Sequence, residues 1–351
     1  MSTKKYNNLA VTGGAGFIGS NFIRYIYKKY KHYNIYNIDR LSYAGNLDNF
    51  HDIVEKENKS NRSKRYHFLK ADICDDLSMG KILKKLDLDV IINFAAESHV
   101  DRSIMNSDEF IKTNISGVHT LIELSKKYKI GRFLQISTDE VYGDVINGYS
   151  TETSPINPSN PYAASKAAAD LLVQSYIRTH GLPALIVRGS NNFGSFQYPE
   201  KLIPLAITNL LEEKVIPIHG DGLQVRSWLH VGDFCNAIDL VLHKAVDGSV
   251  FNVAGEQKQN IEVVEQICEH LGKNYKDYSS HMNDRPGGDM RYAPNSTKIK
   301  QELGWLAKRP INTTLSTIIQ WYIDNQKWWK KIKGKKEFTE HYKKQCKAVY
   351  Y

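Results

Sequence analysis

The chain has 351 residues, of which 41% are hydrophobic and 24% charged, a composition typical of a globular protein with one large domain and a smaller lobe. Its net charge is +9, but the lysines and arginines lie in runs typical of solvated surfaces, without the interleaved aromatic residues of a nucleic-acid-binding module. No stretch has the ~18 apolar residues that a membrane span needs, and the four cysteines lack disulfide or metal-site spacing, so we expect a cytoplasmic protein that binds no nucleic acid, membrane or metal.

Short apolar segments alternate with helical patterns in the first half of the chain. The expected strands are residues 8–12, 34–38, 66–70, 90–94, 133–137 and 184–187. The expected helices include one that follows the first strand and runs to about Tyr30, and residues 109–127 and 161–179, whereas the charged segment 56–64 is expected to be a loop. This alternation predicts an α/β fold with a Rossmann-type doubly wound parallel sheet over residues 1–195.

A glycine-rich loop at residues 13–19 directly follows the first strand and opens a helix. Such glycines permit a tight turn and a close approach to a pyrophosphate, whose charge is stabilised at the helix N-terminus. Asp39, about 20 residues beyond the loop, can accept hydrogen bonds from an adenosine ribose and repels a 2′-phosphate. These features favour NAD over NADP, although Arg40 weakens the preference because an arginine can pair with such a phosphate.

A polar cluster ends the strand expected at residues 133–137 and continues to Glu140. The carboxyl ends of parallel strands are where open α/β sheets bind ligands. Asp139 and Glu140 can therefore take different chemical roles if their surroundings separate their pKa values. The alternative is an acidic turn that is simply solvated.

Tyr162 and Lys166 lie one helical turn apart, so they share a face of the helix expected at residues 161–179. An ammonium group near a phenol favours the phenolate, so Lys166 is expected to lower the pKa of Tyr162 from about 10. Tyr162 would then act as a general base toward a sugar hydroxyl. The same spacing also occurs by chance on exposed helices.

The regular alternation weakens from about Phe196 onward. A helix is expected at residues 202–212, strands at 215–219 and 250–253, and a further helix at 261–271. We assign residues 196–330 mainly to a smaller lobe, some segments of which return to the main domain, and residues 331–351 to a basic C-terminal tail.

The motifs resemble those of the extended short-chain dehydrogenase/reductase superfamily, through the glycine spacing and the Tyr-x-x-x-Lys pair. Within it, the chain resembles the dTDP-glucose 4,6-dehydratases from about Leu9 to Trp328, most clearly at residues 95–103, 137–143, 190–192, 199–204 and 284–287. The Thr-Asp-Glu triplet at 138–140 is the discriminating motif. Sugar-nucleotide 4-epimerases lack this acid pair, and GDP-mannose dehydratases and glucuronate decarboxylases generally carry the Glu without the preceding Asp.

The resemblance implies an NAD-dependent lyase that converts a nucleoside-diphosphate glucose, best dTDP-glucose, into its 4-keto-6-deoxy product. Tyr162 would take the C4 hydroxyl proton, Thr138 would hold the C4 oxygen, and Lys166 would also contact the nicotinamide ribose. Glu140 would then remove the C5 proton, and Asp139 would protonate the departing C6 hydroxyl.

The resemblance also implies two sets of binding residues and a homodimer formed through the helices at 109–127 and 161–179. The expected NAD set is Gly13, Gly16, Phe17, Ile18, Gly19, Asp39, Arg40, Leu41, Ser42, Asp72, Ile73, Ala95, Ala96, Glu97, Ser98, Thr113, Tyr162, Lys166 and Asn192. The expected sugar-nucleotide set, mostly in the smaller lobe, is His99, Thr138, Asn191, Lys201, Leu202, Pro217, Ile218, His219, Arg226, Asn260, Asp284, Arg285, Gly288 and Tyr292.

Some positions depart from the family pattern. Gly194-Ser195 replaces Gly-Pro, His230 replaces a common Tyr, and Gly288 stands where the family usually has His. Because Gly288 lies near the nucleotide end, a UDP-glucose 4,6-dehydratase is the nearest alternative. An epimerase and a non-catalytic NAD-binding regulator are more distant alternatives.

Overall fold

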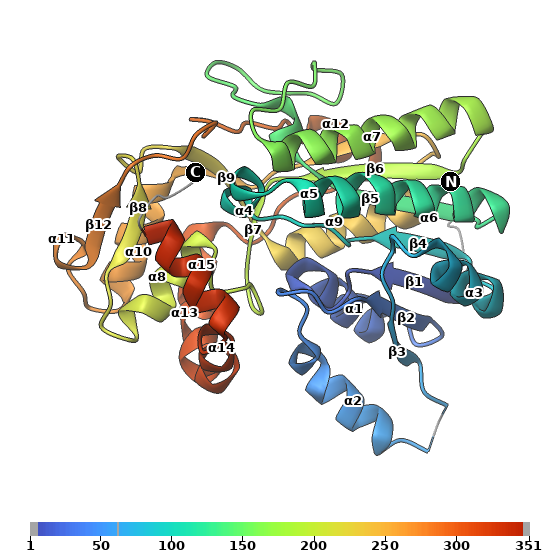
Figure 1. Ribbon diagram of the computed structural model, residues 1–351, viewed down its shortest axis with the longest axis horizontal. Coiled ribbons are helices and arrows are strands. Elements are labelled where there is room, and N and C mark those ends of the chain that lie inside the picture. Colours follow the sequence, from blue (N-terminus) through green and yellow to red (C-terminus); the bar gives the residue numbers. More distant parts are fainter. Residues whose placement is uncertain (1–5, 62, 347–351) are drawn as a thin grey trace.

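The computed structural model describes residues 6–61 and 63–346 and places a large parallel sheet beside a second group of strands and helices (Figure 1). The sheet has seven strands in the order β10-β6-β5-β4-β1-β2-β3. They are β1 (Asn8–Thr12), β2 (Asn34–Asp39), β3 (Tyr66–Lys70), β4 (Val90–Asn93), β5 (Arg132–Thr138), β6 (Ala184–Gly189) and β10 (Val250–Val253). The strand order reverses at β1, which pairs with β2 on one side and β4 on the other, so a ligand crevice is expected at the carboxyl ends of these strands.

Alternate side chains of the buried strands enter two hydrophobic cores, one on each face of the sheet. Leu9 and Val11 of β1 join the core under α1 (Phe17–Lys29) and α9 (Val231–Lys244), whereas Ala10 between them joins the core under the opposite helices. The opposite helices are α3 (Asp76–Leu86), α6 (Val118–Lys127) and α7 (Pro161–His180). The shorter helices of this body are α2 (His51–Asn58), α4 (Val100–Met105), α5 (Asp108–Phe110) and α12 (Thr297–Leu303).

Two expectations about the first half need correction. The segment expected as a loop at 56–64 begins inside α2, because Glu57 is buried and accepts hydrogen bonds from the Tyr27 hydroxyl and the Arg65 amide; residue 62 lies outside the described residues. The helix expected at 109–127 is not regular, because α5 and α6 are joined by a π-helical segment, Ile111–Gly117. Such segments are frequent at functional sites.

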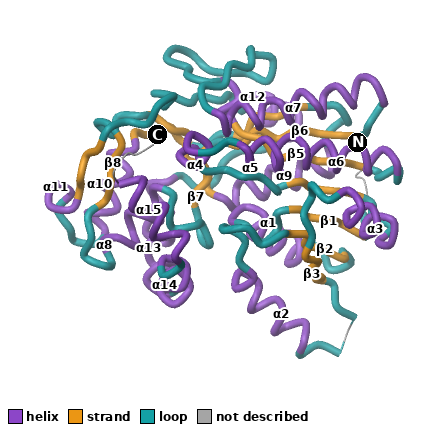
Figure 2. Tube along the Cα trace, in the orientation of Figure 1, coloured by secondary structure: helices purple, strands orange, loops and turns teal. Residues whose placement is uncertain are grey.

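The second lobe has its own sheets and its own core. β11 (Glu256–Gln259), β9 (Val225–His230) and β7 (Asn191–Phe193) form one sheet, and β12 (Ser279–Met282) pairs with β8 (Ile216–His219). The helices of this lobe are α8 (Leu202–Leu210), α10 (Asn260–His270), α11 (Tyr275–Tyr278), α13 (Ile311–Asp324), α14 (Gln326–Lys333) and α15 (Lys336–Cys346). In Figure 2 helices α8, α10, α13, α14 and α15 gather at the left, while α3 and α6 lie at the right. After residue 196 the chain also returns to the main body, since β10 joins the large sheet beside β6 and α9 packs against α1.

Residues 331–346, expected to be part of a basic tail, form the end of α14 and all of α15, and residues 347–351 lie outside the described residues. Trp329 of α14 is fully buried and donates its indole N–H to the Tyr322 carbonyl at 2.8 Å. Phe338 of α15 packs with Tyr198 and Ile332 beside Tyr43. Among the described helices, none is both long and apolar enough to cross a membrane.

Candidate active site

Two adjoining cavities lie along the carboxyl edge of the large sheet. The first has a volume of about 280 Å³ and reaches from the glycine loop to Tyr162, and the second has about 170 Å³ and extends into the smaller lobe. Seven residues line both cavities. They come from the segments after β4 and β5, from β7 and from the segment before α8: Ser98, Glu140, Asn191, Asn192, Gln197, Glu200 and Lys201. A reacting group at this junction would contact both cavities.

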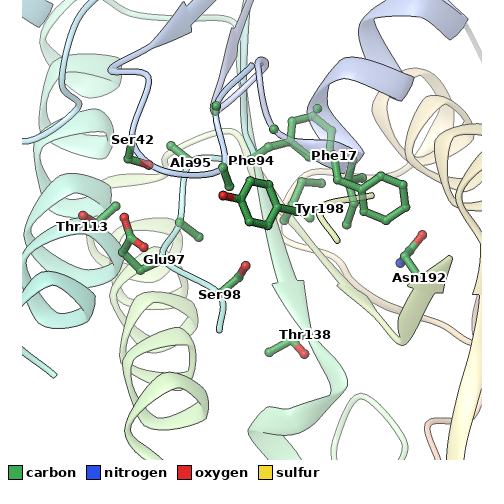
Figure 3. Close-up of a pocket in the computed structure, with 18 of the residues that line it drawn as sticks. Phe17, Ser42, Phe94, Ala95, Glu97, Ser98, Thr113, Thr138, Asn192 and Tyr198 are labelled. Carbon is green, nitrogen blue, oxygen red and sulfur yellow. The ribbon is translucent and has the colours of Figure 1, made fainter. Parts of the chain in front are cut away.

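The glycine loop brings backbone close to the first cavity. A Cβ on Gly19 would lie 2.5 Å from the Gly13 carbonyl oxygen and 2.8 Å from the Gly14 Cα, so the turn needs a residue without a side chain there. Gly16 caps α1 without a side-chain hydrogen bond, which leaves the first amide groups of the helix for an anion. Figure 3 shows Phe17 of this helix, Ala95 after β4 and Thr113 of the π-helical segment around the same cavity.

Asp39 and Arg40 lie at the end of β2 and have different partners. The Asp39 carboxylate accepts hydrogen bonds from the Ala15 amide at 2.9 Å and the Leu41 amide at 2.7 Å. Arg40 pairs with three acids, Glu97 at 2.7 Å, Glu109 at 3.2 Å and Asp72 at 3.3 Å. These acids balance the charge of Arg40, which favours an adenosine ribose without a 2′-phosphate.

The acid pair follows β5 in a short 3-10 helix, Asp139–Tyr142. The Thr138 hydroxyl accepts a hydrogen bond from the Glu140 amide at 3.3 Å and is 3.4 Å from the Asp139 carboxylate. Burial, and then the charge of Glu140, raise the pKa of Asp139 to about 8. Burial also raises the pKa of Glu140, but Arg226, Lys201 and Arg285 oppose that rise. The nearby cations thus favour the ionised form of Glu140, whereas the charge of Glu140 opposes ionisation of Asp139, so the surroundings of the two carboxyl groups act in different directions.

Tyr162 lies in the first turn of α7, which begins where the Asn160 side chain accepts a hydrogen bond from the Ala163 amide at 2.9 Å. Lys166, one turn later, is buried and donates to the Ile136 carbonyl at 2.6 Å. The expectation that Lys166 lowers the pKa of Tyr162 is wrong for this arrangement. Burial raises the pKa of Tyr162, the charge of Glu140 raises it further, and a hydrogen bond with Thr138 opposes the rise. Burial likewise lowers the pKa of Lys166, to about 8.

Arginines and an aromatic ring form the far side of the second cavity. Arg226 donates to the backbone carbonyls of Val225 and Asp289 at 2.9 and 2.8 Å, and its guanidinium lies 4.3 Å from the centre of the Tyr292 ring. The Tyr292 hydroxyl donates to Asp289 at 2.7 Å and lies 3.3 Å from Glu140. Arg226 is thus oriented beside Glu140 and forms no ion pair with a carboxylate among the residues that the structure describes, so its charge is available to an anion.

The structure brings the expected residues together in two groups. Every residue of the expected NAD set lines the first cavity except Leu41, whose amide binds Asp39 instead. Every residue of the expected sugar-nucleotide set lines the second cavity except Thr138, which lines the first.

Sequence reasoning missed four large polar side chains that line the first cavity: Tyr43, Gln197, Tyr198 and Glu200. Tyr43 directly follows Ser42 of the expected NAD set, and Glu200 directly precedes Lys201 of the expected sugar-nucleotide set. Their position next to these residues was the signal that could have identified them. Glu200 is buried, lines both cavities and pairs with Arg102 at 3.2 Å.

The chain is similar to several known proteins in sequence and in fold. The family model described as GDP-mannose 4,6 dehydratase matches residues 10–318. A dTDP-glucose 4,6-dehydratase from Neisseria meningitidis is 41% identical over 346 residues, which cover 92% of this chain and 95% of that protein. A crystal structure of the dTDP-glucose 4,6-dehydratase of Bacillus anthracis in complex with NAD is 46% identical, covers 93% of this chain and 99% of that one, and has a TM-score of 0.85. The corresponding structure from Streptomyces venezuelae, also with NAD bound, is 39% identical with the same coverage and a TM-score of 0.87.

Proposed function

Because this chain belongs to the dTDP-glucose 4,6-dehydratase family, we propose that it converts dTDP-glucose into dTDP-4-keto-6-deoxyglucose, with NAD as its resident cofactor. The enzyme is a hydro-lyase that removes water across C5 and C6 of the sugar. The observation that carries this proposal is the acid pair, Asp139 beside Glu140, at the junction of the two cavities with Tyr162 in the same wall.

The first cavity fits NAD. The N-terminus of α1, which no side chain caps, and the glycine loop suit a pyrophosphate, and Asp39 at the end of β2 suits the adenosine ribose. Two buried polar atoms in the wall, Thr113 Oγ1 and Asn192 Oδ1, have no hydrogen-bond partner within the described chain and suit the polar part of a cofactor. When bound, NAD⁺ would supply a hydride acceptor for C4 and the hydride that returns to C6, and its positive charge would favour the phenolate form of Tyr162.

The first step removes the proton of the C4 hydroxyl. Tyr162 takes this proton as general base, and Thr138, which shares a hydrogen bond with Tyr162, holds the C4 oxygen. Lys166 is held next to this site by its hydrogen bond to the Ile136 carbonyl, and it would contact the nicotinamide ribose of bound NAD. The step leaves a C4 ketone, which acidifies the neighbouring C5–H bond.

The second step eliminates water. Glu140 takes the C5 proton, and its electron pair forms the C5–C6 double bond while the C6 hydroxyl leaves. Asp139 gives that hydroxyl its proton, since a carboxyl with a pKa of about 8 is protonated at neutral pH. Hydride addition at C6 and return of a proton from Glu140 to C5 then complete the 4-keto-6-deoxy sugar.

The second cavity binds the nucleotide part of the substrate. Arg226 and Arg285 carry the charge that a diphosphate needs, and guanidinium groups bind phosphates bidentately. Thymidine is proposed as the nucleoside because the relatives named above are dTDP-glucose enzymes.

A direct assay with two substrates tests the proposal. Purified enzyme is incubated with dTDP-glucose and, separately, with UDP-glucose, and the 4-keto product is followed by its alkaline absorbance. Product from dTDP-glucose is expected. Faster product formation from UDP-glucose would reassign the nucleoside, and no product from either would contradict the dehydratase function.

We further propose that the enzyme is a cytoplasmic homodimer. Cys74, Cys235 and Cys268 are free thiols, as is usual in reducing compartments. Leu171 of α7 and Ile111 of the π-helical segment are 55% and 51% exposed, and a four-helix contact between two copies would cover them.

Light scattering tests the dimer. Leu171→Glu is expected to convert a dimer into a monomer, whereas Leu77→Glu, at a residue 75% exposed on α3, leaves the dimer intact. A wild-type monomer, or a dimer that survives Leu171→Glu, would contradict this interface.

A further inference from the structure

Three metal-ligating side chains from distant parts of the sequence meet where α15 approaches the second cavity. They are His99 at the start of α4, Glu200 before α8, and His341 on α15. One potential ligand atom from each lies within 4.8 Å of the others. All three side chains are buried, with relative exposures of 4%, 3% and 7%.

The two imidazoles each leave a nitrogen unsatisfied. His99 Nδ1 and His341 Nε2 are buried and have no hydrogen-bond partner among the residues that the structure describes. The rings lie edge to face with centroids 4.8 Å apart, so they do not bond to each other. A buried polar atom without a partner is unfavourable, and two of them beside a buried carboxylate indicate a missing group that accepts lone pairs.

We propose that His99, Glu200 and His341 form a binding site for a divalent transition metal ion, with Zn²⁺ the best fit. Two imidazole nitrogens and one carboxylate oxygen are a common three-ligand set for Zn²⁺, which takes a fourth ligand from water or from a bound molecule. The set is too rich in nitrogen for Mg²⁺ or Ca²⁺, which prefer oxygen ligands.

The charges around the three side chains are compatible with a cation. Arg102 and Lys201 oppose a metal ion. Arg102, however, also pairs with Glu337, and the fully buried Asp101, which pairs with Arg285 at 3.3 Å, places a second carboxylate 4.0 Å from His99 Nδ1.

A metal ion at this position would tie α15 to the wall of the second cavity. His99 and Glu200 both line that cavity, whereas His341 comes from the last described helix. Binding would therefore add to the contacts that already join these segments, the ion pairs of Arg102 with Glu200 and Glu337 and the packing of Phe338 against Tyr198. This role does not depend on the dehydratase function.

Equilibrium dialysis of the purified, chelator-treated enzyme against Zn²⁺ tests the proposal, with NAD present throughout. One ion per chain is expected for the wild type, together with a rise in Tm. His341→Gln is expected to weaken binding by at least about 100-fold and to abolish the rise, since even groups that only orient a metal ligand are worth 10–100-fold. His270→Ala, at an exposed histidine on α10, is the matched control and is expected to bind like the wild type.

Co²⁺ in place of Zn²⁺ identifies the ligands. Histidine and carboxylate ligands give visible d–d absorption without the charge-transfer band of a thiolate. The proposal is overturned if the wild type binds no stoichiometric Zn²⁺, if binding survives His341→Gln, or if the cobalt spectrum shows cysteine ligands.

Discussion

Asp139 and Glu140 are neighbours in the chain, and burial raises the pKa of both, yet the charges around them act in different directions. Asp139 is 2% exposed and its largest perturbation is desolvation, which favours the neutral acid. Glu140 is surrounded by Arg226, Lys201 and Arg285, which favour its carboxylate. The residue proposed as the acid is therefore a carboxyl group that keeps its proton at neutral pH, and the residue proposed as the base is one whose ionised form three cations favour.

Glu140→Gln is expected to separate the two halves of the reaction. C4 oxidation needs Tyr162 and not Glu140, so the variant should still reduce its NAD when dTDP-glucose is added. The dehydration rate should fall by about 10²–10⁴-fold, the usual contribution of a general base. Stopped-flow absorbance of NADH and product assays measure the two steps. Glu213→Gln, at an exposed glutamate paired with Lys273, is the control and should have wild-type kinetics, whereas full dehydration by Glu140→Gln would refute the base assignment.

The raised pKa of Asp139 predicts an alkaline limb in the pH profile. The protonated acid is present below a pKa of about 8 and is lost as the pH rises through that value, so kcat for dehydration should fall above about pH 8. Asp139→Asn cannot donate this proton, so its slow overall turnover should lack the limb, while its NADH formation continues. A wild-type kcat that stays constant or rises up to pH 9 would show that Asp139 is not the acid.

At the scale of elements, the glycine loop is packed so closely that adding a single methyl group at Gly19 is expected to change its backbone conformation. Gly19→Ala would place a Cβ 2.5 Å from the Gly13 carbonyl oxygen, so the turn must shift away from the pyrophosphate site. We expect the Kd for NAD to rise by about tenfold or more, since about 1.4 kcal/mol of lost contact is enough for that change. Gly80→Ala in α3 is the control, because the nearest heavy atom is 3.6 Å away. Isothermal titration with NAD compares them, and equal affinities would contradict the close-approach argument.

The elements that local pattern determines were predictable. Every strand expected in the large sheet is present, because buried parallel strands are short, continuous apolar runs between turns. The π-helical segment between α5 and α6 could not be predicted from the local pattern, because it depends on tertiary contacts. Asn114 bonds to Ser165 of α7 at 2.8 Å and to the Glu97 carbonyl at 3.0 Å, and Gly117 lies against Ile73.

In the candidate site, too, features that depend on residues close together in the sequence were predictable, whereas features that depend on tertiary contacts were not. Motif residues identified the two cavities' linings because they follow strands whose ends meet at one edge of the sheet. The pKa of Tyr162 was misjudged because a four-residue spacing says nothing of burial or of the Ile136 carbonyl that Lys166 binds. His341 could not be associated with His99, since nothing local links residues 242 positions apart.

At the scale of the whole molecule, the C-terminal helices connect the lobe to the main body. The Tyr322 hydroxyl donates to the Gln197 carbonyl at 2.8 Å, and the Trp328 indole donates to Asn49 of the main body at 2.9 Å. Trp329, which follows Trp328 in α14 and donates to the Tyr322 carbonyl, is fully buried in the core of the lobe. The cavities lie between these two parts, so their geometry depends on this connection.

Trp329→Ala is therefore expected to reduce the free energy of unfolding by about 3–5 kcal/mol, the range for truncating a buried aromatic residue. It should also raise the KM for dTDP-glucose, because the lobe that carries Arg226 is less firmly held. Tyr149→Ala, at a side chain 61% exposed, is the control and should change stability by no more than about 0.5 kcal/mol. Urea unfolding followed by circular dichroism measures both. A loss below about 1 kcal/mol for Trp329→Ala would mean that α14 is not an integral part of the folded body, and an unchanged KM beside a large loss would mean that it stabilises the fold without positioning the substrate cavity.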